Sequence, residues 1–275
     1  MVRITVLVDD RAGPGLVPEH GLALWVEAEG RRILFDTGQG GALLENASKL
    51  GIDLSQAEDI VLSHGHYDHT GGLATVLSLA TRAKVSLHPS AIEAKYGVSQ
   101  QTARSIGMPE ESMAVLRRLP EEQICWVRKP FEIATGIGLT GPIPRTSGFE
   151  DVGGAFYLDG AGTLPDGLED DLAMWIDTPK GLVVMTGCAH AGLVNTLGHV
   201  RRISGRDKVR AVIGGFHLGG ASGLRLARTA EALRALKPDR IVPGHCTGEA
   251  ATGYLAGLLG KIVEPGMAGQ VHRLE

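Results

Sequence analysis

The sequence predicts an α+β fold arranged as an αββα sandwich, in which two β-sheets pack face to face and helices cover their outer sides. Strand hairpins are followed by a helix, and this order occurs twice along the 275 residues. No low-complexity linker divides the chain, so we expect one domain over residues 1–275. Glycine occurs 39 times, roughly twice its average usage, which is typical of a fold with many tight strand–helix turns.

Composition excludes several classes of partner. Hydrophobic residues make up 43% of the chain and charged residues 21%, as in ordinary globular proteins. Aromatic residues are only 4%, too few for a platform that stacks single-stranded bases. The net charge of −4 argues against general binding to a phosphate backbone. We therefore expect a small-molecule substrate and no nucleic acid, and a second copy of the chain in a homodimer is left open.

The cysteines and the apolar runs indicate a cytoplasmic protein. Cys125, Cys188 and Cys246 are odd in number and widely spaced, which disfavours a disulfide framework. The first ten residues resemble a strand and lack the features of a signal peptide. No apolar run approaches the roughly 18 residues that a membrane span requires. We expect no membrane partner.

The first half of the chain opens with alternating apolar residues that are typical of strands. A loop over residues 11–21 contains two prolines and ends near His20, a candidate substrate contact. Asp36 follows the first hairpin and either braces a later loop or caps the next helix. The elements expected here are strand 3–8, hairpin 22–28 and 32–35, helix 42–50, strand 59–63, helix 73–80 and strand 84–87.

The second half repeats the pattern after a polar insertion. Residues 96–122 are weakly periodic and predict a helical or loop insertion over the site. Loop 141–150 contains Arg145, which can bind a substrate phosphate or carboxylate bidentately or remain a solvated surface residue. The elements expected are strands 123–127, 131–140, 172–177 and 182–186, helix 191–203, strand 209–213, helix 224–236 and strand 241–242.

The main functional signal is the stretch from His64 to His69, which has the pattern H-x-H-x-D-H. Neutral histidine is the commonest protein ligand for transition metals. The stretch lies between a predicted strand and a predicted helix, and alternation places His64 and His66 on one side. Asp68 and His69 lie where the chain turns and can point to a second place nearby. The segment therefore predicts two ligands for each of two metal ions.

Three more histidines each follow a predicted strand, where open-sheet proteins usually place their ligands. They are His190, His217 and His245. We expect His190 to join His64 and His66 on the first ion, and His245 to join Asp68 and His69 on the second. The role of His217 is open between a ligand, a proton donor and a substrate contact.

The stretch from Leu62 to Leu73, with Asp36-Thr37-Gly38 before it, resembles the signature of the metallo-β-lactamase superfamily. It is most similar to the branch that includes 7,8-dihydropterin-6-methyl-4-(β-D-ribofuranosyl)aminobenzene 5′-phosphate synthase-like proteins. Similar pieces recur at Gly187–His190, Gly214–Leu218 and Pro243–Gly248, so the resemblance extends from residue 3 to residue 260. It implies a four-layer αββα sandwich of the metallo-β-lactamase type.

The resemblance also implies a hydrolase that acts on a phosphorylated small molecule, a phosphodiester or a pterin-related phosphate. The cofactors expected are two divalent transition-metal ions, zinc first, with iron, manganese or nickel open. A hydroxide held between the ions would attack, and Asp68 would orient it as well as bind metal. Alternatives are thioester or lactone hydrolysis at the same site, a di-iron oxygen or nitric oxide reductase, and a non-catalytic ligand sensor.

The chain departs from the well-known hydrolase branches at one position. Those carry a bridging aspartate in a Thr-Gly-Asp, whereas this chain has Thr186-Gly187-Cys188. Cys188 either bridges the ions as a thiolate, leaves the bridge to solvent and substrate, or only fills the turn. The acidic run Glu169-Asp170-Asp171 either supplies a compensating carboxylate or consists of turn residues.

Overall fold

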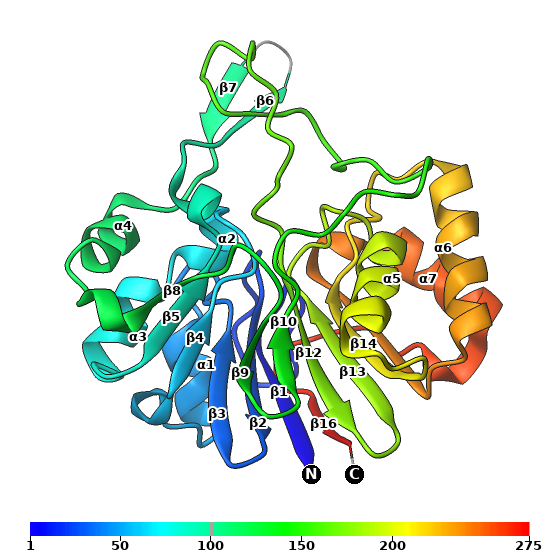
Figure 1. The fold of residues 1–275 in the computed structure, drawn as a ribbon, viewed down its shortest axis with the longest axis horizontal. Coiled ribbons are helices and arrows are strands. Elements are labelled where there is room, and N and C mark those ends of the chain that lie inside the picture. Colours follow the sequence, from blue (N-terminus) through cyan, green and yellow to red (C-terminus); the bar gives the residue numbers. More distant parts are fainter. Residues whose placement is uncertain (100–101, 275) are drawn as a thin grey trace. The chain divides into compact units, whose positions relative to one another are not determined.

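The computed structural model describes residues 1–99 and 102–274 (Figure 1). The chain divides into two compact units. Unit 1 comprises Met1–Arg128, Gly154–Asp170 and Met267–Glu275, and unit 2 comprises Lys129–Gly153 and Asp171–Gly266. The expectation of one domain over residues 1–275 is not tested by this division and stays a prediction.

Unit 1 is built on a seven-stranded sheet in the order β16-β1-β2-β3-β4-β5-β8. The first strands form an antiparallel meander, whereas β3, β4, β5 and β8 run parallel. Because β3 and β4 are parallel neighbours, the segments that follow them begin at the same edge of the sheet. The strands are β1 (Val2–Val8), β2 (Ala23–Ala28), β3 (Arg31–Phe35), β4 (Asp59–Val61), β5 (Lys84–Leu87), β8 (Ile124–Trp126) and β16 (Val271–Leu274).

The helices of unit 1 pack their apolar residues onto this sheet. Leu43, Val76 and Leu116 come from three different helices and belong to one buried cluster with residues of the strands. The short helix α2 is part of the predicted metal-binding stretch itself. The helices are α1 (Leu43–Lys49), α2 (Tyr67–Thr70), α3 (Leu73–Leu79) and α4 (Glu110–Leu116).

A second, three-stranded sheet in the order β11-β6-β7 belongs to unit 1 and stands beyond the α2 end of the larger sheet (Figure 1). It consists of β6 (Tyr96–Ser99), β7 (Thr102–Ser105) and β11 (Phe156–Tyr157). The expectation of a helical or loop insertion over residues 96–122 is therefore wrong in part, although α4 lies within it. Positions 100 and 101 lie outside the described residues. The partner strand β11 is distant in sequence, so local periodicity did not indicate the pairing.

Unit 2 is built on a six-stranded sheet in the order β15-β14-β13-β12-β10-β9. The expected single strand over residues 131–140 is instead a tight hairpin, because Gly136 turns the chain with φ 75°. The strands are β9 (Phe131–Ala134), β10 (Ile137–Leu139), β12 (Ala173–Thr178), β13 (Gly181–Thr186), β14 (Val209–Gly215) and β15 (Arg240–Gly244).

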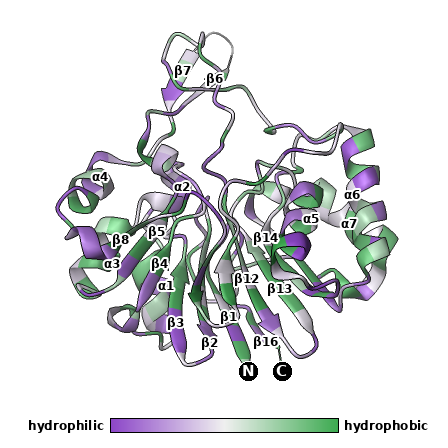
Figure 2. Ribbon diagram, in the orientation of Figure 1, coloured by the Kyte–Doolittle hydropathy of each residue, from purple (hydrophilic) through white to green (hydrophobic). Residues whose placement is uncertain are grey.

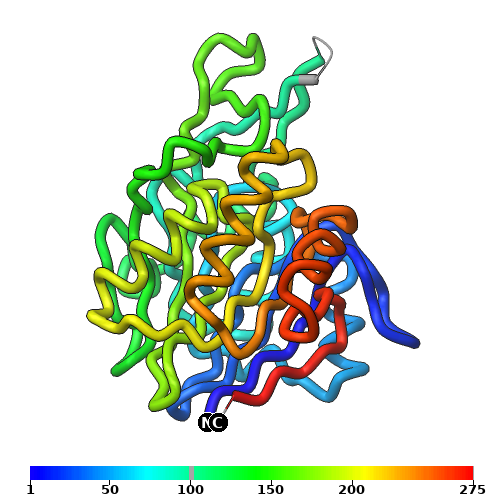
Figure 3. The backbone as a smooth tube through the Cα atoms, turned by 90° about the vertical axis from the view of Figure 1, so that its right-hand side faces the viewer, coloured from blue at the N-terminus to red at the C-terminus, as the bar shows by residue number. Residues whose placement is uncertain are grey.

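Three helices of unit 2 lie side by side: α5 (Leu193–Ser204), α6 (Gly223–Leu236) and α7 (Glu249–Leu259) (Figure 3). Leu197, Leu233 and Leu255 come one from each helix and share a buried cluster with strand residues. Hydrophobic residues are frequent in the strands, and the helices carry both hydrophobic and hydrophilic residues (Figure 2). Among the described residues, no helix is both long enough and apolar enough to cross a bilayer.

The three strand-end histidines of unit 2 follow neighbouring parallel strands. His190, His217 and His245 come after β13, β14 and β15, which pair in parallel in that order. Two of the three have unusual backbones, because His217 has φ 46° and His245 has φ 47°. A left-handed conformation in a residue other than glycine is costly, and it is concentrated at functional sites. The sheet thus brings the candidate residues of unit 2 to one edge.

The glycine pattern gives a first test of this packing. Gly214 has φ +127°, and a Cβ there would lie 2.0 Å from the carbonyl oxygen of Thr186. We predict that Gly214→Ala lowers the free energy of unfolding by about 2–4 kcal/mol, from strain plus overpacking. Gly253 lies inside α7 with nothing within 4 Å of an added Cβ. Gly253→Ala should raise stability by about 0.5–1 kcal/mol through helix propensity. Urea denaturation measures both, and equal effects of the two variants would contradict the packing.

Candidate metal centre

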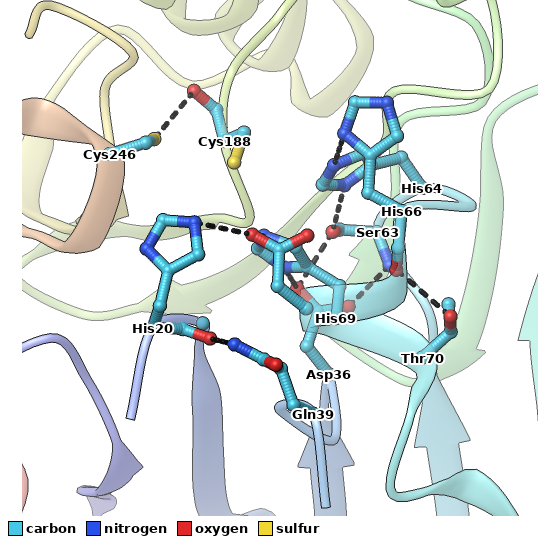
Figure 4. Close-up of polar contacts among 12 residues, drawn as sticks. His20, Asp36, Gln39, Ser63, His64, His66, His69, Thr70, Cys188 and Cys246 are labelled. Atoms are coloured by element: carbon cyan, nitrogen blue, oxygen red, sulfur yellow. Dashed lines mark hydrogen bonds and ion pairs between the residues drawn. The ribbon is translucent and has the colours of Figure 1, made fainter. Parts of the chain in front are cut away.

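The first candidate pair of ligands lies at the start of the H-x-H-x-D-H stretch. His64 is fully buried and His66 nearly so. The Nε2 atom of His64 lies 3.0 Å from Nδ1 of His66 (Figure 4). Two nitrogens bonded to one tetrahedral zinc ion lie roughly 3.3 Å apart, given the usual zinc–nitrogen bond lengths. The separation of these two nitrogens is close to that spacing.

The second candidate pair follows in α2. The Nε2 atom of His69 lies 3.8 Å from Oδ2 of Asp68, and both side chains are buried. His20 approaches the same carboxylate, with Nε2 3.4 Å from Oδ2 of Asp68 and Nδ1 3.0 Å from Oδ2 of Asp10. The structure therefore places His20, expected as a substrate contact, beside a candidate ligand.

Asp36 holds the stretch from behind. Its side chain is fully buried and accepts hydrogen bonds from Ser63 N, Ser63 Oγ and His69 Nδ1, each at 2.7 Å (Figure 4). A proton on Nδ1 of His69 leaves the Nε2 lone pair to point at a metal, as carboxylate–histidine–metal arrangements do. No capping bond from Asp36 to helix α1 is formed, since the N-cap residue is Ala42. Of the two roles left open for Asp36, bracing is confirmed.

The acidic run has a structural role that differs from residue to residue. Glu169 is exposed, whereas Asp170 and Asp171 are buried. In unit 1, Asp170 accepts a hydrogen bond from Gly65 N at 2.7 Å. In unit 2, Asp171 accepts one from Ala191 N at 2.7 Å, next to His190. Each buried carboxylate therefore fixes the main chain beside a candidate ligand.

His190 and His217 lie together in unit 2. Both contact the segment that precedes Gly154: His190 Nδ1 donates to the Val152 carbonyl at 2.8 Å, and His217 Nε2 lies 3.2 Å from the Gly153 carbonyl. Their ring centroids are 4.2 Å apart. Because His190 Nδ1 carries the proton in this hydrogen bond, the lone pair on its other nitrogen, Nε2, is available to bind a metal ion. Nothing in the sequence pattern had singled out residues 152 and 153.

Two cysteines complete the unit 2 cluster. Ligand atoms of Cys188, His190 and His217 all lie within 4.8 Å of one another, as do those of Cys188, His245 and Cys246. Burial would raise the pKa of the Cys246 thiol, but its hydrogen bond to Cys188 and the positive charges of His245 and His217 lower this pKa well below the usual range. Burial would lower the pKa of His217, but Cys246 and the Gly153 carbonyl raise it overall. Cys188 thus lies among potential ligands, and its role as a bridge or as a turn residue stays open.

Arg145 is placed against the main chain of His190. Its Nη1 atom donates a hydrogen bond to the His190 carbonyl at 2.6 Å. One N–H group of the guanidinium therefore stabilises the backbone at His190. The same loop is fixed at Glu150, which accepts hydrogen bonds from Val194 N and Asn195 N at the start of α5. A substrate role for Arg145 stays a prediction.

The donor sets fit transition-metal ions. Unit 1 offers two imidazoles at one place, and an imidazole with a carboxylate at another, with Asp36 orienting His69. Unit 2 offers imidazoles with an adjacent thiol. Imidazole suits zinc, iron and nickel, a carboxylate admits manganese, and a thiol favours zinc. Bound ions in such sets can act as Lewis acids or lower the pKa of water.

Comparisons with known proteins agree with this chemistry. The family model of the metallo-beta-lactamase superfamily matches residues 16–245. A 7,8-dihydropterin-6-methyl-4-(beta-D-ribofuranosyl)-aminobenzene-5'-phosphate synthase of Methanocaldococcus jannaschii is 33% identical over 267 residues, which cover 90% of this chain and 88% of that protein.

Two solved structures are also similar. The crystal structure of Tm1679, a metal-dependent hydrolase of the beta-lactamase superfamily, has a TM-score of 0.84 and 30% identity, covering 100% of this chain and 99% of that one. The metallo-beta-lactamase fold protein YhfI of Bacillus subtilis has a TM-score of 0.61 and 12% identity, covering 99% and 100% of the two chains, and it supports the fold alone. The fold class expected from the sequence is confirmed.

The role of Asp36 can be tested through metal affinity. We predict that Asp36→Ala weakens zinc binding by about 10–100-fold, because His69 loses the partner that fixes its tautomer and orientation. A chelator competition titration measures the dissociation constant. Asp53→Ala is the matched control, since Asp53 is a carboxylate that bonds Ser55 at the surface turn where η1 (Leu54–Gln56) begins. Equal zinc affinity of the two variants would reject the bracing role.

Proposed function

This chain belongs to the metallo-beta-lactamase superfamily, and we propose that it is a dinuclear metal-dependent hydrolase that acts on a phosphorylated small molecule. The observation that carries the proposal is the pairing of donors in unit 1. His64 and His66 face each other at 3.0 Å, while His69 faces Asp68 and is held by Asp36. Histidines that served only packing would not need two such separate groups of donors.

The proposed ligands are the set that the sequence predicts. The first ion would be held by His64, His66 and His190, and the second by Asp68, His69 and His245. We propose zinc for both, because imidazole, carboxylate and a neighbouring thiol all tolerate it. Iron, manganese and nickel are left open.

Bound in this set, two divalent ions would lower the pKa of water toward neutrality and offset the negative charge of the transition state. The residues of the chain supply the rest. Asp68 would accept a hydrogen bond from the attacking water and so aim it. His217 would donate a proton to the leaving group or contact the substrate.

The substrate class rests on the named relatives. One is a synthase whose name describes a pterin joined to a ribofuranosyl aminobenzene phosphate, and another is a metal-dependent hydrolase. We therefore propose a phosphodiester or pterin-related phosphate as substrate. Hydrolysis of a thioester or lactone is the second candidate, since the same water would attack a carbonyl.

The synthase name favours one further alternative, a bond-forming reaction between two substrates at the same centre. A non-catalytic sensor is weaker, because the proposed set offers three ligands to each of two ions. A di-iron reductase is weaker, because it usually needs a carboxylate in place of the second histidine, and the stretch has His66 there. We also propose a cytoplasmic protein with a small-molecule substrate and no nucleic-acid or membrane partner, and leave a homodimer open.

Metal content tests the proposal first. We predict about two transition-metal ions per chain after purification without chelators, because the ligands divide into two groups of three. Elemental analysis of the purified full chain measures the ratio. An active preparation that holds only one ion would rule out the dinuclear site.

Single substitutions separate the roles of the histidines in unit 2. We predict that His190→Ala loses one ion, whereas His217→Ala keeps both and loses turnover. His199→Ala is the control, because His199 lies on α5 and bonds the Thr140 carbonyl instead. Elemental analysis and turnover are measured together, and loss of metal from His217→Ala with retention in His190→Ala would reverse the assignment.

Isotope labelling tests the nucleophile. A screen of bis(p-nitrophenyl) phosphate, p-nitrophenyl phosphate, a lactone and a thioester first identifies a hydrolysed compound. In ¹⁸O-labelled water, one heavy oxygen should enter the acid product in a single turnover, because water attacks directly.

Cys188→Ser should keep measurable turnover, and Asp68→Asn should lose most of it. A covalent adduct trapped on Cys188, or a product without label, would contradict direct attack. If no compound is turned over unless a second substrate is added, the bond-forming alternative gains instead.

A further inference from the structure

Unit 1 contains a buried ammonium group outside the ligand set. Lys95 is only 1% exposed, and its Nζ atom lies 2.9 Å from Oδ2 of Asp166 and 3.0 Å from Oδ1 of Asp170. A buried charge is tolerated when it is paired and hydrogen-bonded. With two carboxylates and one ammonium, the three side chains would carry one net negative charge when ionised. No step of the proposed reaction uses them.

Asp170 connects this cluster to the metal-binding stretch. Its second oxygen, Oδ2, accepts a hydrogen bond from Gly65 N, the residue between His64 and His66. Gly65 is also enclosed on another side, because a Cβ there would lie 2.1 Å from the Ala91 carbonyl oxygen. The peptide that joins the two facing histidines is therefore held between a buried carboxylate and a packed backbone.

The same cluster anchors the three-stranded sheet. Lys95 immediately precedes β6, while Asp166 and Asp170 follow β11, and β6 pairs with β11. Two further contacts join this sheet to the metal-binding stretch: Tyr67 N donates to the Ile106 carbonyl at 2.9 Å, and the Phe156 ring lies 5.3 Å from that of His66. A shift of His64 or His66 would therefore also displace the residues at the start of β6 and β11.

We propose that Lys95 and Asp170 are positioning residues that set the His64–Gly65–His66 geometry and couple metal binding to the order of the three-stranded sheet. Asp170 places its carboxylate on the peptide between the ligands, and the cluster's negative charge favours a nearby cation. Lys95 keeps two carboxylates buried together, which would otherwise repel each other and take up a proton. The inference rests on the proposed function, because it takes His64 and His66 as ligands.

Zinc affinity of full-length variants tests the positioning role. Asp170→Ala removes both the acceptor and the charge, and should weaken zinc binding in a chelator competition by about 10–100-fold. Asp170→Asn keeps an acceptor for Gly65 N and should show a smaller loss, while Lys95→Met should also weaken binding. Glu169→Gln is the matched control, since Glu169 is the exposed neighbour of Asp170. It should bind zinc as the unchanged protein does.

Hydrogen exchange separates positioning from general stability. Zinc should slow exchange in peptides that cover β6 and β11 in the unchanged protein and in Glu169→Gln, but not in Asp170→Ala. A purely structural role would speed exchange with and without zinc alike and leave the effect of zinc intact. If Asp170→Ala does not fold, the zinc-dependent exchange of Asp170→Asn is compared with that of the unchanged protein instead.

The outcomes distinguish this inference from the function on which it rests. Unchanged zinc affinity and unchanged zinc-dependent protection in folded Asp170 variants would overturn the inference while leaving the metal site standing. Failure of the unchanged protein to bind zinc or another divalent transition metal would overturn both. A loss of affinity confined to the Lys95 and Asp170 variants, with the zinc effect on β6 and β11 gone, is the expected result.

Discussion

Buried carboxylates that accept hydrogen bonds from the predicted metal-binding stretch are the constraint on which unit 1 depends. Three imidazoles and an aspartate are buried within six residues, and each imidazole must present a defined nitrogen. Asp36 meets this need at His69 and Ser63, and Asp170 meets it at Gly65. The parallel order of β3 and β4 is what brings Asp36 beside the stretch, because both segments leave the same edge of the sheet.

In unit 2, carboxylates and a backbone carbonyl hold His190 and the chain that follows it. Asp171 fixes the peptide after His190, and the Val152 carbonyl fixes the ring itself. Glu150 accepts two N–H groups at the start of α5, so the helix that follows this turn is anchored by a carboxylate. The positive φ angles of His217 and His245 persist because the packed strand ends over-determine them. In both units, carboxylates outside the proposed ligand set hold the main chain beside the candidate ligands.

The sequence predicted the repeated strands and helices, the histidines at strand ends and the family, since each leaves a local pattern in the chain. Prediction failed where pairing is distant: β6 pairs with β11, and β16 adds to β1 across almost the whole chain. Helix α7 was missed because two glycines interrupt its pattern. Lys95 was missed because a lysine beside a polar insertion is usually solvated, and only the fold buries it beside Asp166 and Asp170. The bracing role of Asp36 was one of two readings that its position allowed, and the hydrogen bonds decided between them.

We propose that one short stretch, from His64 to His69, supplies ligands to two ions. Crystals of the full chain grown with zinc, measured with X-rays at the zinc absorption edge, test it directly. We expect two anomalous peaks, one within bonding distance of His64 Nε2 and His66 Nδ1, and the other within bonding distance of Asp68 and His69. A single peak, or two peaks that leave either pair of side chains without metal, would contradict it.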